Sequence, residues 1–442
     1  MKNQAIELAD LYAFKLGCLW RALKAEHLSL WMLCIYFFLE YVRPQDLYPV
    51  LDILPWTQVF LIATIVTAFF DHSVRWVSNA ENKLLILFLI IATLSGIFAF
   101  MPGRSLKYWD VLGGWAIAYF LVINIVNTEK RLILFLLAYS LFNFNMAQHG
   151  SLTWIMRGFS FADFGLLGSP GYFRNSGEYA VQMLIFGSLA ISIVVSLKGY
   201  WGQYKKWFFY LCAATGYMAV MGASSRGSQI GLAVISVWFL LKQEGGFKGL
   251  FVLLVAVAFL YYLLPDKQLL RFQEIGEDEN SLQRLTYYIH GINEVIPKHP
   301  ILGVGYQNWL PYLNFTVPEG MGPMQKNQDP HNIYIQAAAE LGLFGFLVFI
   351  LLIVFAFKNN AQTRLLAKKI DNNFYFNLSY GLDAGLIGYL IAGSFVTILY
   401  YPFFWVQISM IVMLNNVMKR VYISNDSTMY KKRLETGVKR NF

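Results

Sequence analysis

The sequence predicts an all-α polytopic integral membrane protein, with about twelve transmembrane helices and one large, partly helical outer loop. Composition is the first observation: 57% of the 442 residues are hydrophobic and 14% are charged, whereas soluble domains carry about 25% charged residues. The second is that apolar residues form runs close to the roughly 20 residues that a bilayer requires. The third is that charged residues gather between these runs. Together they exclude soluble, disordered and disulfide-rich classes of protein.

The N-terminal segment, residues 1–27, carries charges throughout and has no continuous apolar core, which argues against a cleaved signal peptide. Apolar residues such as Leu8, Tyr12 and Leu19 recur in it at helical spacing. This pattern suits either an amphipathic helix on the membrane surface or a plain cytoplasmic segment. We expect the segment to be cytoplasmic and the first span to act as an uncleaved signal.

Apolar runs predict nine spans in residues 28–264 and three in residues 333–418. The nine lie at 28–42, 53–70, 84–100, 108–126, 132–147, 178–197, 207–223, 227–241 and 247–264. The last three lie at 333–357, 380–400 and 403–418. Residues 265–332 form the long outer loop between the two groups, and residues 419–442 form a basic tail.

The Lys and Arg residues orient these spans. With both termini inside, inner loops hold about three times as many basic residues as outer loops, once the long loop and the tail are set aside. Cytoplasmic loops show this excess, so we expect both termini to be cytoplasmic. The net charge of +9 is then mostly a consequence of topology, with membrane lipids as partners and no nucleic acid.

The long outer loop is predicted to contain an amphipathic helix. Asn280 or Ser281 can cap it, and Pro297 and Pro300 are expected to end it. Its apolar stripe is Leu282, Leu285, Ile289, Ile292 and Ile296. A helix of about four turns is therefore expected on the outer side.

Arg226 lies in the short outer link at 222–228. It is either an anchor that reaches lipid headgroups or an anion-binding group, because the Ser and Gly residues around it leave backbone N–H groups open. Basic residues are usually scarce on the outer side of a membrane protein. An arginine at this position therefore favours the anion-binding role. A guanidinium suits a phosphate or diphosphate.

His331 immediately precedes the predicted span at 333–357. It is either a local hydrogen-bonding group or a catalytic one, since the positive end of the helix dipole keeps the ring neutral, as a general base requires. Glu340 would lie about 13.5 Å deeper along that helix. There it either hydrogen-bonds a neighbouring helix or orients a catalytic group.

Other charged residues give weaker indications. Arg284 lies off the apolar stripe of the outer helix, so its spacing alone predicts a solvated position. Arg174 precedes a span and could pair with Glu178. Asp383, in the span at 380–400, is expected to be a polar group in helix packing.

Motifs for metal or nucleotide chemistry are absent from the sequence. The three cysteines, Cys18, Cys34 and Cys212, show no metal-ligand spacing, and there is no Asp-rich cluster or Gly-Lys-Ser/Thr phosphate loop. We therefore expect no metal, no cofactor and no nucleotide hydrolysis.

An ordered set of motifs resembles the O-antigen ligase and polymerase family. The set is Ser225-Arg226-Gly227, Arg284-Leu285, the segment 299–306 (HPILGVGY), His331-Asn332-Ile333-Tyr334 and the segment 339–345 (AELGLFG). The resemblance covers about residues 172–418. The first 130 residues match in hydropathy only, although Tyr41-Val42-Arg43-Pro44-Gln45 is similar to relatives linked to exopolysaccharide or protein-sorting clusters.

The resemblance implies a GT-C-like glycosyltransferase of the bacterial inner membrane, acting at the periplasmic face on undecaprenyl-diphosphate-linked glycan without a metal ion. It implies that Arg226 and Arg284 neutralise the leaving diphosphate. His331 would either take the proton of the acceptor hydroxyl or hydrogen-bond the diphosphate. Arg174 and Tyr306 are second-rank candidates for contacts with the donor.

Several functions stay open at this point. A ligase would use lipid A-core as acceptor, a polymerase another lipid-linked repeat, and a protein O-glycan ligase a protein. We favour the ligase because the region from Arg284 to His331 resembles ligases slightly more. A solute or anion transporter would use Arg226 and Glu340 as a substrate path, but the long structured outer loop disfavours it.

Overall fold

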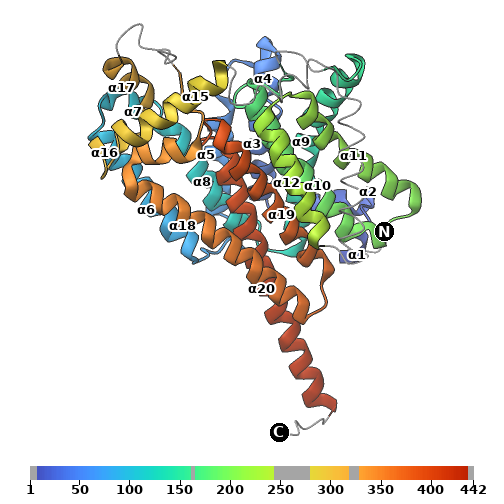
Figure 1. The fold of residues 1–442 in the computed structure, drawn as a ribbon. Coiled ribbons are helices and arrows are strands. Elements are labelled where there is room, and N and C mark those ends of the chain that lie inside the picture. Colours follow the sequence, from blue (N-terminus) through green and yellow to red (C-terminus); the bar gives the residue numbers. More distant parts are fainter. Residues whose placement is uncertain (1–6, 161–164, 243–278, 318–327, 437–442) are drawn as a thin grey trace.

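The computed structural model describes residues 7–160, 165–242, 279–317 and 328–436, and every regular element within them is helical (Figure 1). Helices α15, α16 and α17 gather at one end of the bundle, and α20 projects from the opposite end (Figure 1). The all-helical architecture predicted from the sequence is confirmed for these residues. The ninth predicted span, 247–264, lies outside them.

The α-helices are α1 (Leu8–Tyr12), α2 (Leu16–Lys24), α3 (Leu28–Tyr41), α4 (Pro44–Leu47), α5 (Trp56–Phe69), α6 (Ala80–Ile97), α7 (Pro102–Lys107), α8 (Trp109–Ile125), α9 (Glu129–Met156), α10 (Ser176–Leu197), α11 (Gln203–Gly222), α12 (Arg226–Lys242), α15 (Glu279–His290), α16 (Ile296–Lys298), α17 (Trp309–Thr316), α18 (Ile333–Lys369), α19 (Asn373–Ala392) and α20 (Pro402–Thr436). Four short segments complete the part of the chain that the structure describes: η1 (Pro49–Leu51), η2 (Lys198–Tyr200), the π-helical η3 (Gly291–Val295) and η4 (Gly393–Phe395).

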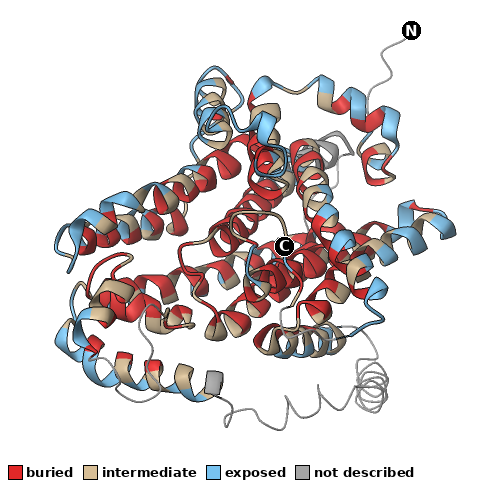
Figure 2. Ribbon diagram, turned by 90° about the horizontal axis from the view of Figure 1, so that it is seen from above, coloured by how far each residue is buried: buried red, intermediate tan, exposed pale blue. Residues whose placement is uncertain are grey.

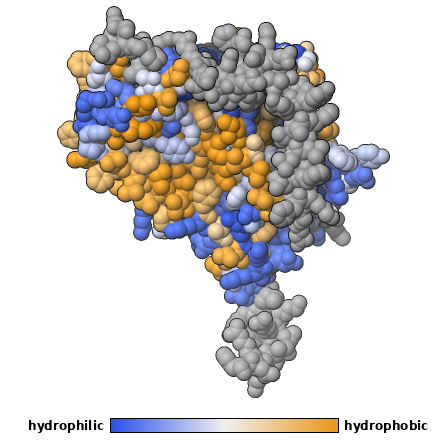
Figure 3. All heavy atoms as spheres, viewed as in Figure 1, coloured by the Kyte–Doolittle hydropathy of each residue, from blue (hydrophilic) through white to orange (hydrophobic). Residues whose placement is uncertain are grey.

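Four helical segments of the described chain are long and apolar enough to cross a bilayer: α6, α9, α10 with η2, and α18. A fifth arises if α2 and the helix after it count as one span, bent by 114°. Apolar residues also form a broad belt across the molecule in Figure 3, with hydrophilic residues below it, towards α20. The protein is therefore an all-α membrane protein, and the number of twelve spans stays a prediction.

Helix α10 lies at the centre of the bundle, and almost all of its residues are buried. Buried residues concentrate in the middle of the bundle in Figure 2, and exposed residues on its outer helices. Close packing around α10 depends on small residues. A Cβ at Gly216 of α11 would lie 3.0 Å from the Cα atom of Gly187, and one at Gly381 of α19 would overlap the side chain of Ser192.

Helix α18 is broken at Gly342, whose φ of 70° and ψ of −176° suit only glycine. The segment 300–305 fills the break, and a Cβ at Gly342 would overlap the Ile301 carbonyl group. Three backbone hydrogen bonds join the two segments: Val304 N–H to the Ala339 oxygen (2.8 Å), Gly305 N–H to the Glu340 oxygen (3.1 Å) and Leu343 N–H to the Pro300 oxygen (2.8 Å). Two motifs of the sequence, 299–306 and 339–345, thus form one structural unit.

Helix α15 and its continuation through η3 and α16 occupy the region where the sequence predicts an amphipathic helix. Its apolar stripe faces outward, because Leu282, Leu285 and Ile289 are 44%, 52% and 50% exposed. Tyr287, on the other side of α15, is fully buried. An exposed apolar stripe of this kind suits the interface between lipid and water.

The N-terminal helices pack onto the bundle. Trp201 Nε1–H donates to the Tyr12 carbonyl oxygen at 2.8 Å, and Lys205 Nζ donates to the Ala13 carbonyl oxygen at 2.5 Å. Leu16 and Trp20 of α2 stay exposed. One face of this segment is therefore held by protein, and the other is left apolar and accessible.

Candidate active site

Arg226 opens α12 at a sharp reversal of the chain. Ser224, at the end of the preceding turn, has a left-handed φ of 55°. Gly227 allows α12 to lie close to η4, because a Cβ at Gly227 would lie 2.6 Å from Cδ2 of Phe395 in η4. The local structure thus explains the Ser-Arg-Gly motif: it places an arginine at a tight reversal of the chain, where the residue after it has to be small.

His331 is held by its backbone on both sides. Its φ of 47° lies in the left-handed region, a strain that clusters at functional sites. Its N–H donates to Oγ1 of Thr397 at 2.9 Å, and its carbonyl oxygen accepts from Oη of Tyr288 at 3.1 Å. Asn332 next to it caps α18 by accepting from the N–H of Tyr334 at 2.8 Å.

The imidazole of His331 is neutral at physiological pH. Burial and, to a smaller extent, the positive charge of Arg284 lower the pKa of His331 to about 4. The sequence predicted a neutral ring from the helix dipole, but burial and Arg284 are the main causes. A neutral ring can donate one hydrogen bond and accept another.

A polar cavity of about 310 Å³ lies beside His331, and we call it the arginine compartment. Arg226, Arg284 and His331, from α12, α15 and the link before α18, all line it. Its remaining lining residues are Asn175, Ser176, Gly177, Glu178, Ser224, Ser225, Gly227, Asp329, Phe395, Val396, Thr397 and Tyr401. Three candidates far apart in the sequence thus meet at one polar cavity, and Arg284 is half-buried there rather than solvated.

Two carboxylates in this cavity were not proposed as site residues from the sequence. Glu178 lies in the first turn of α10, and Asp329 precedes His331 by two residues. Burial raises the pKa of Asp329, and the charge of Arg104 lowers it in part. The sequence signal for Asp329 is its place in the segment that leads to His331. Glu178 gave no signal beyond a possible pairing with Arg174.

A second, smaller polar cavity of about 50 Å³ adjoins the first, and we call it the carboxylate compartment. It is lined by Arg104, Gln307, Leu310, Asp329, Gln336, Glu340, Thr397, Tyr400 and Tyr401. Glu340 is buried there and accepts from the N–H of Trp309 at 2.9 Å and from Nε2 of Gln336 at 3.4 Å. Asp329, Thr397 and Tyr401 line both compartments.

The remaining predicted residues lie elsewhere. Arg174 is exposed and is not among the described residues that line either compartment, although its neighbour Asn175 is. Tyr306 is fully buried: its Oη donates to the Tyr108 carbonyl oxygen at 2.8 Å, and its ring packs on that of Tyr400 with centroids 4.6 Å apart. Tyr306 therefore supports the wall of the carboxylate compartment from behind.

Asp383 belongs to a separate polar cluster. It accepts from Nη1 of Arg364 at 2.6 Å and from Nδ2 of Asn360 at 2.7 Å, and its side chain is 1% exposed. These contacts join α18 to α19, as expected of a polar group in helix packing. Asp383 does not line either compartment.

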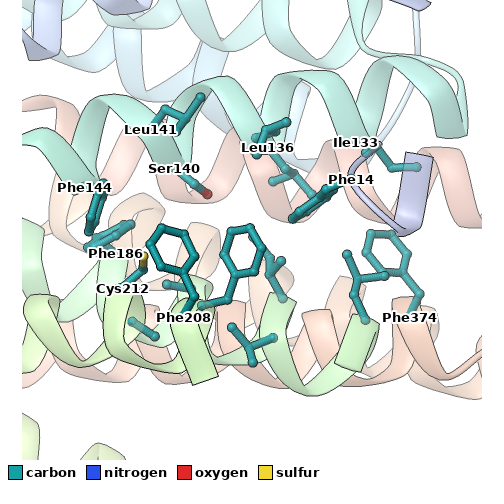
Figure 4. A pocket seen from close by; sticks show the side chains of 17 residues that line it. Phe14, Ile133, Leu136, Ser140, Leu141, Phe144, Phe186, Phe208, Cys212 and Phe374 are labelled. Carbon is teal, nitrogen blue, oxygen red and sulfur yellow. The ribbon is translucent and has the colours of Figure 1, made fainter. Parts of the chain in front are cut away.

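An apolar cavity of about 130 Å³ lies between α9, α10 and α11 (Figure 4). Phenylalanine side chains, Phe144, Phe186 and Phe208 among them, line it together with aliphatic ones, and Ser140 is one of its few polar residues (Figure 4). It contains none of the candidate site residues.

Comparison with known proteins supports the motif-based reading. No curated protein matches the chain. The described residues contain no group of three or more His, Cys, Asp or Glu side chains placed to hold a metal ion. The family model described as O-antigen ligase matches residues 208–350, about a third of the chain, which include Arg226, Arg284 and His331. The resemblance predicted from the motifs is confirmed for this segment of the chain, which is similar to the O-antigen ligase family.

Proposed function

We propose that this protein transfers a glycan from undecaprenyl diphosphate to an acceptor hydroxyl at the periplasmic face of the bacterial inner membrane. In its most specific form the proposal is an O-antigen ligase whose acceptor is lipid A-core, working without a metal ion. The family match supports a glycan-transferring membrane enzyme of the O-antigen ligase type in broad terms. The observation that carries the finer proposal is that two arginines and a neutral histidine line one polar cavity.

The arginines answer the main electrostatic demand of this reaction. As the bond from the anomeric carbon to the phosphate oxygen breaks, negative charge develops on the lipid diphosphate. Guanidinium groups pair with phosphate oxygens through two parallel hydrogen bonds. Removing one group of this kind typically costs about 3–4 kcal/mol of transition-state stabilisation. Arg226 and Arg284, which enter the cavity from α12 and α15, are the residues proposed for this role.

The neutral ring of His331 is suited to either of two roles. It can accept the proton of the acceptor hydroxyl, or it can donate a hydrogen bond to the diphosphate. Its two backbone hydrogen bonds fix the position from which the ring reaches the cavity. Arg174, exposed beside the lining residue Asn175, is proposed to contact the donor at the rim, and Tyr306 to act through the ring of Tyr400.

The test uses the purified protein in lipid nanodiscs with an undecaprenyl-diphosphate-linked glycan as donor. Lipid A-core and a second lipid-linked glycan are offered separately as acceptors. We expect transfer to lipid A-core, and a loss of about 10²–10³-fold in rate for Arg226→Ala and Arg284→Ala. Arg157→Ala removes an exposed arginine after α9 and is the matched control, with an unchanged rate.

The acceptor decides between the candidates. Transfer to the lipid-linked glycan alone would replace the ligase by a polymerase, which shares the donor and the motifs. Consumption of neither substrate pair by the wild-type protein would refute the glycosyltransferase proposal. Loss of transfer after treatment with EDTA would refute its metal-independent form.

A further inference from the structure

The two polar compartments meet at a shared wall. Asp329, Thr397 and Tyr401 line both of them, whereas the remaining lining residues belong to one or the other. Thr397 is fixed at this wall by accepting the N–H of His331 at 2.9 Å. Tyr401 packs against Tyr172 with ring centroids 5.1 Å apart. A reaction that joins two substrates needs two binding regions that meet at the reacting atoms, and this wall is where the compartments meet.

The two compartments differ in chemistry. The arginine compartment carries Arg226 and Arg284 and so suits an anion. The carboxylate compartment holds one arginine, Arg104, whose Nε donates to the Gln307 carbonyl oxygen at 2.7 Å. It also offers oxygen and amide groups, from Gln336 and Glu340 among others, together with the rings of Tyr400 and Tyr401. Carboxylate, amide and tyrosyl groups are hydrogen-bonding partners for hydroxyl groups, and aromatic rings pack against the apolar faces of ligands. This set fits a carbohydrate hydroxyl better than a phosphate.

We propose that the carboxylate compartment binds the acceptor hydroxyl and that Asp329, at the shared wall, is the catalytic base that removes its proton. This inference rests on the proposed glycosyltransferase function and adds to it a site for the second substrate and a residue for the proton transfer. The acceptor group is a carbohydrate hydroxyl in both the ligase and the polymerase form.

The step balances as follows. The acceptor oxygen forms a bond to the anomeric carbon of the donor glycan, while the bond from that carbon to the phosphate oxygen breaks. The electron pair of the broken bond leaves with the lipid diphosphate, whose charge Arg226 and Arg284 neutralise. The hydroxyl proton passes to a carboxylate oxygen of Asp329. No atom is oxidised or reduced.

Asp329 suits proton removal better than its neighbours. Asp329 lines both compartments, whereas His331 lines the arginine compartment only. Burial also raises the pKa of Asp329 and makes it a stronger base than an ordinary aspartate. Glu340 is engaged with the N–H of Trp309 and with Gln336. Glu178 lines the arginine compartment only. His331 is then left to hydrogen-bond the diphosphate.

Several titratable or charged groups face Asp329 from the elements around it. They are Arg104, Glu178, Arg226, Arg284, His331, Glu340 and Tyr401. The charge of Arg104 lowers the pKa of Asp329, and burial outweighs it. In the wild type we therefore expect the transfer rate to fall at low pH through a pKa above the ordinary aspartate value of about 3.9.

The decisive variant is Asp329→Asn, which keeps the shape of the side chain and removes the base. We expect its transfer rate to fall by about 10²–10⁴-fold and the acid limb of its pH profile to disappear. Its affinity for undecaprenyl diphosphate alone should stay within twofold of the wild type, whereas Arg226→Ala and Arg284→Ala lose that affinity. Asp329→Glu should recover part of the rate and the acid limb. Glu178→Gln, the matched change at the other carboxylate, should keep the acid limb.

A second variant tests the compartment without touching the base. Leu310 lines the carboxylate compartment from α17, and Leu310→Trp should reduce transfer while leaving the affinity for undecaprenyl diphosphate unchanged. Phe315→Trp, at an exposed position of the same helix, is its control and should transfer at the wild-type rate. Leu310→Trp tests whether the carboxylate compartment binds the acceptor even if Asp329→Asn does not fold.

Other outcomes overturn the proposal. A full transfer rate in folded Asp329→Asn, an acid limb that vanishes in Glu178→Gln instead, or loss of undecaprenyl diphosphate affinity in Leu310→Trp would each do so. A wild-type protein that consumes no lipid-linked glycan refutes the proposed function itself, which is a different result from all of these.

Discussion

Substituting Gly342 by alanine should destabilise the protein by about 2–5 kcal/mol. The residue has φ 70° and ψ −176°, a conformation in which a residue with a Cβ is strained by about 1–3 kcal/mol. The added Cβ would also overlap the Ile301 carbonyl group, so the segment 300–305 has to move. That movement weakens up to three backbone hydrogen bonds, each worth about 0.5–1.5 kcal/mol.

Thermal unfolding of the purified variant in one fixed detergent measures this effect, and hydrogen exchange over 299–305 locates it. The matched control is Gly114→Ala in α8, where nothing lies within 4 Å of the new Cβ. Alanine in a helix interior should stabilise this control by about 0.5–1 kcal/mol. If Gly342→Ala unfolds at the same temperature as Gly114→Ala, the break in α18 is not held as described.

Three further predictions concern the site and its surroundings. Thr397→Val removes the acceptor of the His331 N–H, which should cost about 1–3 kcal/mol of stability and slow transfer, with a circular-dichroism melt and a rate assay as checks. The pKa of His331 is lowered to about 4 in the folded protein, mainly by burial, whereas a histidine in the unfolded chain has a pKa of about 6.5. As the pH falls from about 6.5 towards 4, the unfolded chain binds a proton that the folded protein does not, so stability that is complete above about pH 6.5 is lost. His331→Gln should therefore flatten the dependence of the melting temperature on pH over this range. Asp383→Ala leaves the partly buried Arg364 without its carboxylate partner and should destabilise the protein by about 3–5 kcal/mol. The folded fraction should keep its specific activity. A large loss of specific activity would place Asp383 in the reaction instead.

The sequence order of the motifs led to the residues that meet at the arginine compartment. Arg226, Arg284 and His331 could be proposed because each is an ionisable group in an unusual place. Arg284 shows the limit of spacing arguments. Its offset from the apolar stripe predicted contact with water, but the stripe itself is exposed and the arginine is turned towards the bundle. Which face of an amphipathic helix meets protein and which meets lipid is not encoded in its periodicity.

The proximity of Asp329, Thr397 and Tyr401 could not be identified in advance, because it arises only when α18, α19 and α20 pack together. The break in α18 was also invisible, since hydropathy is high on both sides of Gly342 and predicts one continuous span. It becomes evident only through the partner segment that fills it.

Helix α9 shows the opposite limit of hydropathy. The predicted span ends at residue 147, where polar residues interrupt the apolar run, but the helix continues to Met156. A polar side chain beyond residue 147 is satisfied by a neighbouring helix: Ser151 Oγ donates to the Thr215 carbonyl oxygen of α11 at 2.7 Å. Hydrogen bonds between helices therefore extend a helix beyond the point where composition predicts its end.

The outward-facing stripe of α15 makes the bilayer a determinant of how the site works. Leu282, Leu285 and Ile289 present about half of their surfaces away from the protein, while Arg284 on the same helix lines the arginine compartment. If acyl chains cover that stripe, the height of Arg284 above the membrane midplane follows the thickness of the leaflet. Rates measured in detergents or nanodiscs of different chain length would then compare different depths of the site as well as different lipids.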